Sequence, residues 1–400
     1  MSNTVSRDYT LWEQSELSIN QNGDRFESRA GALILHFSGP RRCLSSSPLN
    51  GGVTDVLTSA FNLNLQCFGR HSALSAETYE ETLQLAATKL SLNPQNTTAL
   101  ATAAWLERAV VAEIEEGGIW LQAVMTGGIR QNAVNAGDPA SYYESLEESE
   151  NFYPCGTLNL LLSTNIKLSP GALCKALITA TEAKTGCLRD LYLPSTVSPD
   201  YATGSGTDGT ILISNLTGPE LTDTSSHSLF GELLSKVVKL VLRRSLLINT
   251  GVCTAHFHNL ETLLSRYGSG QLRLFELLKS KQPATAARAL LHQFPSIAEK
   301  IESGEYTARG FCQLYKRIQF DSQAIVFTVL YLHLLDCHRH GLLEWGEIFR
   351  EGFDLIYAIL DCKNFELSEI SGILTKPIEV DEFLEVLEMT LLILIFSEKD

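Results

Sequence analysis

The residues best suited to chemistry lie in a short stretch around position 157. Thr157 follows Gly156 and directly precedes the apolar run 158–163, which predicts that its hydroxyl stands at the rim of a buried strand. A hydroxyl there can act as a nucleophile when a neighbouring group accepts its proton. Thr157 is also an ordinary β-branched strand residue, and the pattern leaves both interpretations open.

A loop of small residues at 203–209 contains the second candidate group, Thr207 and Asp208. The spacing of its glycines satisfies G-x-G-x-x-G, but a dinucleotide site needs that motif to follow a strand and open a helix. Here the loop precedes the predicted strand 210–214 instead. The dinucleotide interpretation therefore fails, and the residues by themselves are compatible with a plain turn.

Two helices supply further charged candidates. The predicted helix 169–188 contains Glu182 and Lys184, which are two positions apart and so cannot both face one site. His227 precedes the predicted helix 228–247 and can serve as an acid or base near neutral pH. The alternatives are a salt bridge for the helix charges, and an exposed His227 beside a capping Ser228.

The segment 126–139 contains backbone and side-chain donors. Gly127 and Gly128 permit close approach of the backbone, and Asn132 adds a side-chain amide, so the three could stabilise an oxyanion. Ordinary turn and cap chemistry is the simpler explanation of the same residues.

The elements that must position these groups indicate two regions. After a polar extension over residues 1–29, strands (31–37, 120–126, 158–163, 210–214) interleave with helices (76–90, 97–108, 169–188, 228–247). Residues 30–249 are therefore predicted to form an α/β (α+β) domain with a mixed sheet and flanking helices. Only helices are predicted over 250–400, at 260–279, 285–294, 296–301, 307–318, 322–338, 343–360 and 381–396. This second domain is expected to be all-α.

Composition narrows the classes of function. The chain of 400 residues has 31 basic and 46 acidic side chains, a net charge of −15 that disfavours nucleic acid and anionic lipid as partners. Nine cysteines without a C-x-x-C pair indicate reduced thiols in the cytoplasm. The apolar runs are shorter than the ~20 residues that a membrane span needs, so no membrane partner is expected. Scattered histidines, including His256 and His340, give no metal-site spacing, and no metal is expected.

The stretches 155–165, 168–173, 181–185 and 202–209 resemble the signature region of the adenosylcobinamide amidohydrolases, over about residues 31–247. The resemblance implies hydrolysis of the amide that joins aminopropanol, or its phosphate, to the corrin ring side chain, giving adenosylcobyric acid. Cobalt would belong to the corrinoid substrate, so no separate cofactor is implied. The resemblance also implies that the 203–209 loop approaches the substrate closely and that Asp208 orients a reacting group or accepts a proton. It implies catalytic roles for Thr157, Thr207, Asp208 and His227, and substrate-binding roles for Asn50, Gly127, Gly128, Asn132, Asn159, Glu182 and Lys184.

A more distant resemblance around Gly156–Thr157 is to the β-peptidyl aminopeptidase and ornithine acetyltransferase group, in which a comparable peptide is cleaved to release a nucleophile. The sequence leaves open whether Thr157 or a water attacks and whether the 156–157 peptide is cut. The alternative function is a non-catalytic corrinoid-binding or sensing protein. Its helical domain would bind a protein partner, and assembly into a homo-oligomer is equally open.

Overall fold

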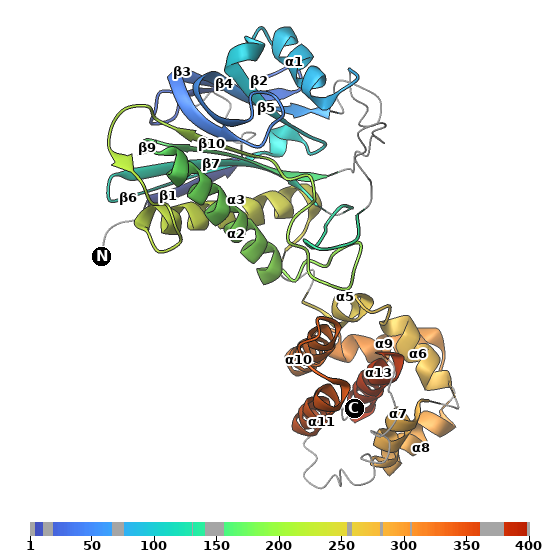
Figure 1. Ribbon diagram of the computed structural model, residues 1–400. Coiled ribbons are helices and arrows are strands. Elements are labelled where there is room, and N and C mark those ends of the chain that lie inside the picture. The colour runs from blue at the N-terminus through green and yellow to red at the C-terminus, as the bar shows by residue number, and fades with distance from the viewer. Residues whose placement is uncertain are drawn as a thin grey trace. The chain divides into compact units, whose positions relative to one another are not determined.

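Figure 1 shows the computed structural model of the chain. The structure describes residues 5–10, 19–65, 76–129, 131–140, 156–253, 258–280, 283–304, 306–360 and 380–397. Two compact units divide the chain, Met1–Cys253 and Thr254–Asp400. His256 lies outside the described residues.

The first unit is built on a mixed sheet of nine strands within the described residues. The strand order is β1 (Val5–Thr10), β6 (Val110–Glu116), β7 (Ile119–Gly128), β8 (Thr157–Thr164), β10 (Thr210–Ser214), β3 (Ala32–Ser45), β4 (Gly52–Asn64) and β5 (Thr97–Thr102), with β2 (Arg25–Arg29) paired to β3. The pairs β8–β10 and β4–β5 are parallel and the other pairs are antiparallel. Strands β9 (Lys167–Leu168) and β11 (Glu220–Leu221) form a separate two-stranded ribbon.

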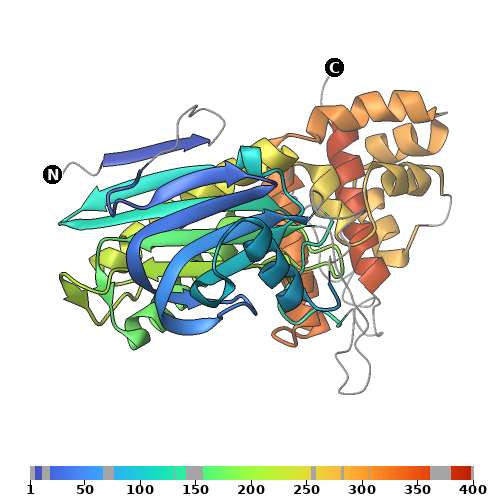
Figure 2. The same cartoon turned by 90° about the horizontal axis from the view of Figure 1, so that it is seen from above.

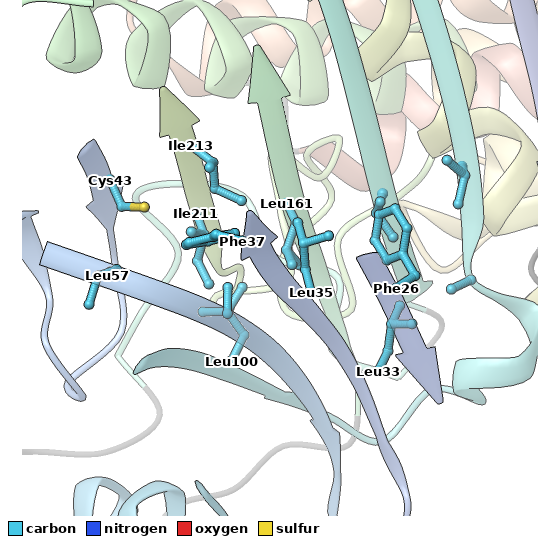
Figure 3. Packing of buried hydrophobic residues seen from close by; sticks show 14 of the residues in the cluster. Phe26, Leu33, Leu35, Phe37, Cys43, Leu57, Leu100, Leu161, Ile211 and Ile213 are labelled. Atoms are coloured by element: carbon cyan, nitrogen blue, oxygen red, sulfur yellow. The ribbon is translucent and has the colours of Figure 1, made fainter. Parts of the chain in front are cut away.

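The sheet folds over itself along β3 and β4. The register of the β3–β4 pair shifts between His36 and Cys43, and such irregularities bend a strand. Figures 1 and 2 show β3 and β4 crossing over the strands β7, β8 and β10. A buried apolar cluster fills the space inside this fold, and Figure 3 shows Leu35, Leu100 and Leu161 meeting there from three strands. The folded sheet thus brings β5 near β8.

Alternate side chains along β3 belong to two separate hydrophobic cores. Leu33 and Leu35 belong to the cluster inside the folded sheet, whereas Ala32 and Ile34 pack on the opposite face with the helix α1 (Tyr79–Lys89). Side chains of a strand point to alternate faces, so a run of apolar residues can serve both cores. Both faces of β3 are therefore buried in this stretch.

Helices α2 (Pro170–Asp190) and α3 (Leu229–Thr250) lie side by side against the sheet, where α3 contacts β6 and β7 and α2 contacts β10 (Figure 1). Ser169 caps α2 by accepting from the Ala172 amide, and Pro170 occupies the first turn, where a missing N–H costs nothing. Ser228 caps α3 through the Gly231 amide. These caps explain why both helices begin where the sequence predicts.

The prediction for residues 97–108 is wrong. The sequence indicated a helix over residues 97–108, but the structure has the strand β5, followed by the 3-10 helix η4 (Leu106–Arg108). Asn93 caps a 3-10 turn, η3 (Pro94–Asn96), and the β-branched Thr97 and Thr98 then pair with β4. Pairing with the distant strand β4 therefore decides the structure of this segment, although its apolar residues have helical spacing.

Residues 1–29, expected to be a polar extension, contain the strands β1 and β2. Strand β1 pairs with β6 and β2 pairs with β3, so both belong to the sheet. The polar composition of β2 suits a partly exposed strand, since only Phe26 of its five residues is buried.

The second unit is all-α in the described residues, as the sequence predicts. Its helices are α5 (Leu260–Ser265), α6 (Gln271–Lys279), α7 (Thr285–His292), α8 (Pro295–Ser303), α9 (Ala308–Ile318), α10 (Ser322–Arg339), α11 (Trp345–Leu360) and α13 (Val380–Ser397). Stacked Tyr331 and Phe383 rings, with centroids 4.3 Å apart, join α10 to α13. No helix in the described ranges is by itself long and apolar enough to cross a membrane, and the bent pair α9–α10 meets that test only when both helices are taken together.

Candidate active site

The candidate site lies where the parallel strands β8 and β10 begin. Thr157 is the first residue of β8, and residues 207–209 lead directly into β10, whose Thr210 pairs with Leu160. Two parallel neighbours start at the same edge of a sheet, so the two predicted motifs meet there. The Thr157 hydroxyl donates to the Thr207 carbonyl at 2.7 Å, and the side chain is 4% exposed.

Asp208 connects three segments at this edge. Its Oδ1 accepts from the amides of Leu158 at 3.3 Å and Ser205 at 3.2 Å, and from the Ser205 hydroxyl. Its Oδ2 lies 3.3 Å from the ammonium of Lys184 on α2. An ionised carboxylate is purely an acceptor, and all of these partners are donors. The carboxylate next to Thr157 is thus fixed by β8, by its own loop and by a helix.

The carbonyl of Gly156 accepts two side-chain hydrogen bonds. Asn132 donates from Nδ2 at 2.6 Å and Thr207 donates from Oγ1 at 2.9 Å. The Oδ1 atom of Asn132 is buried and has no hydrogen-bond partner among the described residues. A buried amide oxygen without a partner is uncommon and is suited to a donor on a ligand.

A row of buried asparagine side chains supports the floor of the site. Asn159 donates to Asn62 Oδ1 at 2.9 Å and to the Ala101 carbonyl at 2.8 Å, and Asn62 donates to the Thr126 hydroxyl at 2.8 Å. These bonds tie β8 to β4, β5 and β7. Asn62 was not predicted, although a lone asparagine between Phe61 and Leu63 in an apolar strand was a usable signal.

Gly127 and Gly128, predicted as oxyanion donors in a turn, are the last two residues of β7. They pair with Leu158 and Thr157 in the β7–β8 register, so they belong to the sheet beside the site. Ser205 was missed as well. It binds both Asp208 and the Thr207 amide, and its place between two glycines of the 203–209 loop was the available signal.

The two charges of α2 separate as their spacing predicts. Lys184 is 4% exposed and faces Asp208, whereas Glu182 is exposed and accepts from the Ser226 hydroxyl at 3.1 Å. His227, next to Ser226, is exposed just before α3. Glu182 therefore contacts the segment before α3, and no described hydrogen bond joins Glu182 or His227 to Thr157.

Asn50 is engaged elsewhere. Its side chain donates to the carbonyls of Pro94 and Thr97, each at 2.7 Å, and it adopts a left-handed φ of 49°. These contacts hold the loop after β3 against β5.

This arrangement can support acyl transfer. A hydroxyl at a strand start, a carboxylate–ammonium pair and side-chain donors lie at the same edge of the sheet. Within the described ranges, no group of three or more His, Cys, Asp or Glu side chains could hold a metal ion.

Fold and site therefore define an α/β domain with a buried hydroxyl and a largely buried ion pair at the common edge of β8 and β10. The chain belongs to the adenosylcobinamide amidohydrolase family, whose sequence profile matches residues 16–254. An uncharacterized protein of Methanocaldococcus jannaschii is 27% identical over 245 residues, which cover 57% of this chain and 90% of that relative. A solved structure, the PH0078 protein from Pyrococcus horikoshii, covers 62% of this chain and 85% of its own with 11% identity and a TM-score of 0.30.

Proposed function

We propose that the first unit hydrolyses the amide between aminopropanol, or its phosphate, and the corrin ring side chain of adenosylcobinamide, giving adenosylcobyric acid. Family membership supports the substrate class. We infer the reaction type, attack by a hydroxyl, from the position of Thr157. Its hydroxyl lies at the common edge of β8 and β10, where Asp208 and two side-chain donors are also found. Cobalt enters as part of the substrate, and the chain's own residues supply the chemistry.

In this mechanism the Thr157 Oγ1 attacks the substrate amide carbon, and the aminopropanol nitrogen leaves with a proton. Water then hydrolyses the ester on Thr157 and releases the corrin carboxylate. Asn132 Nδ2 and Thr207 Oγ1, which donate to the Gly156 carbonyl at 2.6 and 2.9 Å, would stabilise the developing oxyanion by exchanging that acceptor for it. Lys184 balances the charge of Asp208. Asp208, whose Oδ1 accepts from the Leu158 amide directly after Thr157, accepts the Thr157 proton and passes it to the departing nitrogen.

The test is incubation of the purified chain with adenosylcobinamide and identification of the released amine by mass. Release of aminopropanol together with adenosylcobyric acid is the expected result. Thr157→Ala should abolish release, whereas Thr157→Ser should retain part of it, because a serine oxygen reaches nearly the same position.

A matched control is Thr164→Ala, at the far end of the same strand. The Thr164 hydroxyl also donates to a backbone carbonyl, that of Trp120 at 2.9 Å, so the control loses a comparable buried bond away from the site. Full turnover in Thr157→Ala would exclude this nucleophile. Binding of the corrinoid without hydrolysis by the unmodified chain would instead favour a sensing protein.

A further inference from the structure

The Thr157 hydroxyl faces two acceptors. It donates to the Thr207 carbonyl at 2.7 Å and to Asn159 Oδ1 at 3.2 Å. A backbone carbonyl oxygen and a side-chain amide oxygen accept hydrogen bonds and never donate them. Among the residues that the structure describes, no group donates to Thr157 Oγ1, so its lone pairs stay available for attack.

The orientation of the Asn159 amide decides which of its atoms faces Thr157. Its Nδ2 donates to Asn62 Oδ1 at 2.9 Å and to the Ala101 carbonyl at 2.8 Å, so both amide hydrogens are used. A side-chain amide has two hydrogens on nitrogen and one oxygen. With both hydrogens directed toward β4 and β5, only the oxygen is left to face Thr157.

Asn62 provides one of the two acceptors for Asn159. It lies on β4, 97 positions away along the chain, and is 1% exposed. Its own Nδ2 donates to the Thr126 hydroxyl at 2.8 Å, which leaves its Oδ1 to face Asn159. The other acceptor, the Ala101 carbonyl, belongs to the backbone of β5. An Asn159 amide turned the other way would set its oxygen against both acceptors, so the folded sheet selects one orientation.

The space around Asn159 Oδ1 is narrow as well. A Cβ on Gly209, the residue before β10, would lie 2.8 Å from this oxygen, and Asn159 is only 1% exposed. Thr157 is the described donor to Asn159 Oδ1. The amide oxygen is therefore held between the Gly209 backbone and the hydroxyl of Thr157.

We propose that Asn62 is a positioning residue for Thr157 and that it acts through Asn159. Without the Asn62 acceptor, one Asn159 N–H is buried and has no partner, which is unfavourable. Turning this N–H toward Thr157 Oγ1 relieves that cost, and it engages a lone pair that attack requires. The proposal rests on the proposed function in taking Thr157 as the nucleophile. Asn62 itself has no described hydrogen bond to Thr157.

The experiment compares the full wild-type chain with Asn62→Leu, because leucine has a similar size and no acceptor. The kcat of amine release should fall by up to about 10²-fold, the scale expected when a reacting group is misplaced by about 1 Å. KM should stay unchanged, because Asn62 is buried behind Asn159. Rates are compared per folded molecule. If Asn62→Leu does not fold, Asn62→Met replaces it, since methionine also lacks an oxygen acceptor and adapts more easily to a core.

Two further variants separate positioning from simple packing. Asn62→Asp should keep a kcat near that of wild type, because either form of the carboxyl group offers an oxygen to Asn159. Asn159→Leu removes the residue through which Asn62 acts, so adding Asn62→Leu to it should lower kcat no further. Additive losses, or an Asn62→Asp as slow as Asn62→Leu, would overturn the proposal.

Ser59→Ala is the matched control. Ser59 also lies on β4, is 4% exposed, and forms a hydrogen bond with the Thr97 hydroxyl of β5 at 2.7 Å. The control thus loses a buried side-chain bond between the same two strands. Neither of its partners has a described hydrogen bond to Asn159 or Thr157, so Ser59→Ala should keep kcat.

A second measurement does not depend on turnover. In the full chain labelled with [15N]asparagine, NMR follows the exchange of the Asn159 side-chain amide with deuterium. Asn62→Leu should speed this exchange, and Ser59→Ala should not. Unchanged exchange in Asn62→Leu, or a normal kcat, overturns the proposal. A wild-type chain that releases no amine, but whose Asn159 exchange still depends on Asn62, overturns the proposed function alone.

Discussion

The Lys184 ammonium lies 3.3 Å from Asp208 Oδ2, and the two side chains are only 5% and 18% exposed. Lys184 comes from the third quarter of α2, and Asp208 from the loop before β10, so this ion pair fixes the loop against the helix. The same carboxylate binds the Leu158 amide directly after Thr157. Disturbing the pair should therefore affect both the stability of the unit and the position of the nucleophile.

Replacing Lys184 by methionine should lower the free energy of unfolding by about 2–3 kcal/mol, because the Asp208 charge loses its partner in a mostly buried site. Turnover per folded molecule should fall as well. Denaturant unfolding and amine release measure the two effects. Lys175 lies on the same helix as Lys184 and forms an exposed pair with Asp223 of the loop before α3, so Lys175→Met is the control and should change neither stability nor turnover. Equal effects of the two variants would show that the burial of Lys184 has no special role.

Asp208→Asn should lower turnover by about 10²–10⁴, the usual scale for removing an acid–base group. Asparagine still offers an oxygen to the Leu158 amide, so the chain should fold, although the attraction to Lys184 weakens. Asp190→Asn removes a carboxylate that pairs with Lys239 and Arg243 on the surface, and it should keep full turnover. Rates are compared per folded molecule. A variant that unfolds early yet reacts normally would make Asp208 purely structural.

The sequence predicts the strands of the site well because they are buried on both faces. The apolar runs 158–163 and 210–214 match β8 and β10 closely, and small-residue loops mark their starts. Local pattern failed at 97–108, where pairing with β4 decides the structure. That outcome depends on residues about 40 positions away, which no short window contains.

The residues of the candidate site also fall into two sets: those that a local sequence signal predicts, and those that only the folded sheet brings together. Thr157 and Asp208 were identified because each sits beside glycine at a strand start, a purely local signal. The link between Asn159 and Asn62 spans 97 positions and exists only once the sheet has folded over. The family resemblance groups Glu182 and His227 with Thr157, whereas the Glu182 carboxylate accepts from the Ser226 hydroxyl and His227 is exposed before α3.

Gly156→Ala should be far more damaging than Gly137→Ala. Both glycines have positive φ, +127° and +108°, so either substitution strains the backbone by about 1–2 kcal/mol. Only at Gly156 would the new methyl group collide with neighbours, because nothing lies within 4 Å of a Cβ at Gly137. Thermal unfolding and amine release should show a larger loss for Gly156→Ala in both measurements. Matching losses would mean that strain alone, without close packing, determines the cost.

Alkaline pH should expose the role of Tyr79 on α1. Burial raises the pKa of its hydroxyl to about 12, and the Ala101 amide donates to it at 3.0 Å. An unfolded tyrosine ionises near pH 10, so this group stabilises the fold fully below pH 10 and progressively less as the pH rises toward 12. Tyr79→Phe should cost about 1 kcal/mol at pH 8, where the Ala101 amide loses its acceptor.

The difference between wild type and Tyr79→Phe should shrink between pH 10 and 12, because only the wild type then loses stability through this ionisation. Denaturant unfolding of both proteins at pH 8 and pH 11 measures this stability difference. A gap that stays constant across this range would show that Tyr79 ionises as readily in the folded chain as in the unfolded one.

A chain ending at Cys253 should fold and hydrolyse the corrinoid amide at the full rate. Every residue of the candidate site lies in the unit Met1–Cys253, and α3 ends there with a left-handed Gly251 whose amide donates to the Leu247 carbonyl at 3.0 Å. Such a cap finishes the helix without help from later residues. Cooperative unfolding and amine release of the truncated chain provide the test. A folded but inactive truncation would mean that residues 254–400 contribute directly to the reaction, whereas an insoluble one would mean that they protect an apolar surface of the first unit.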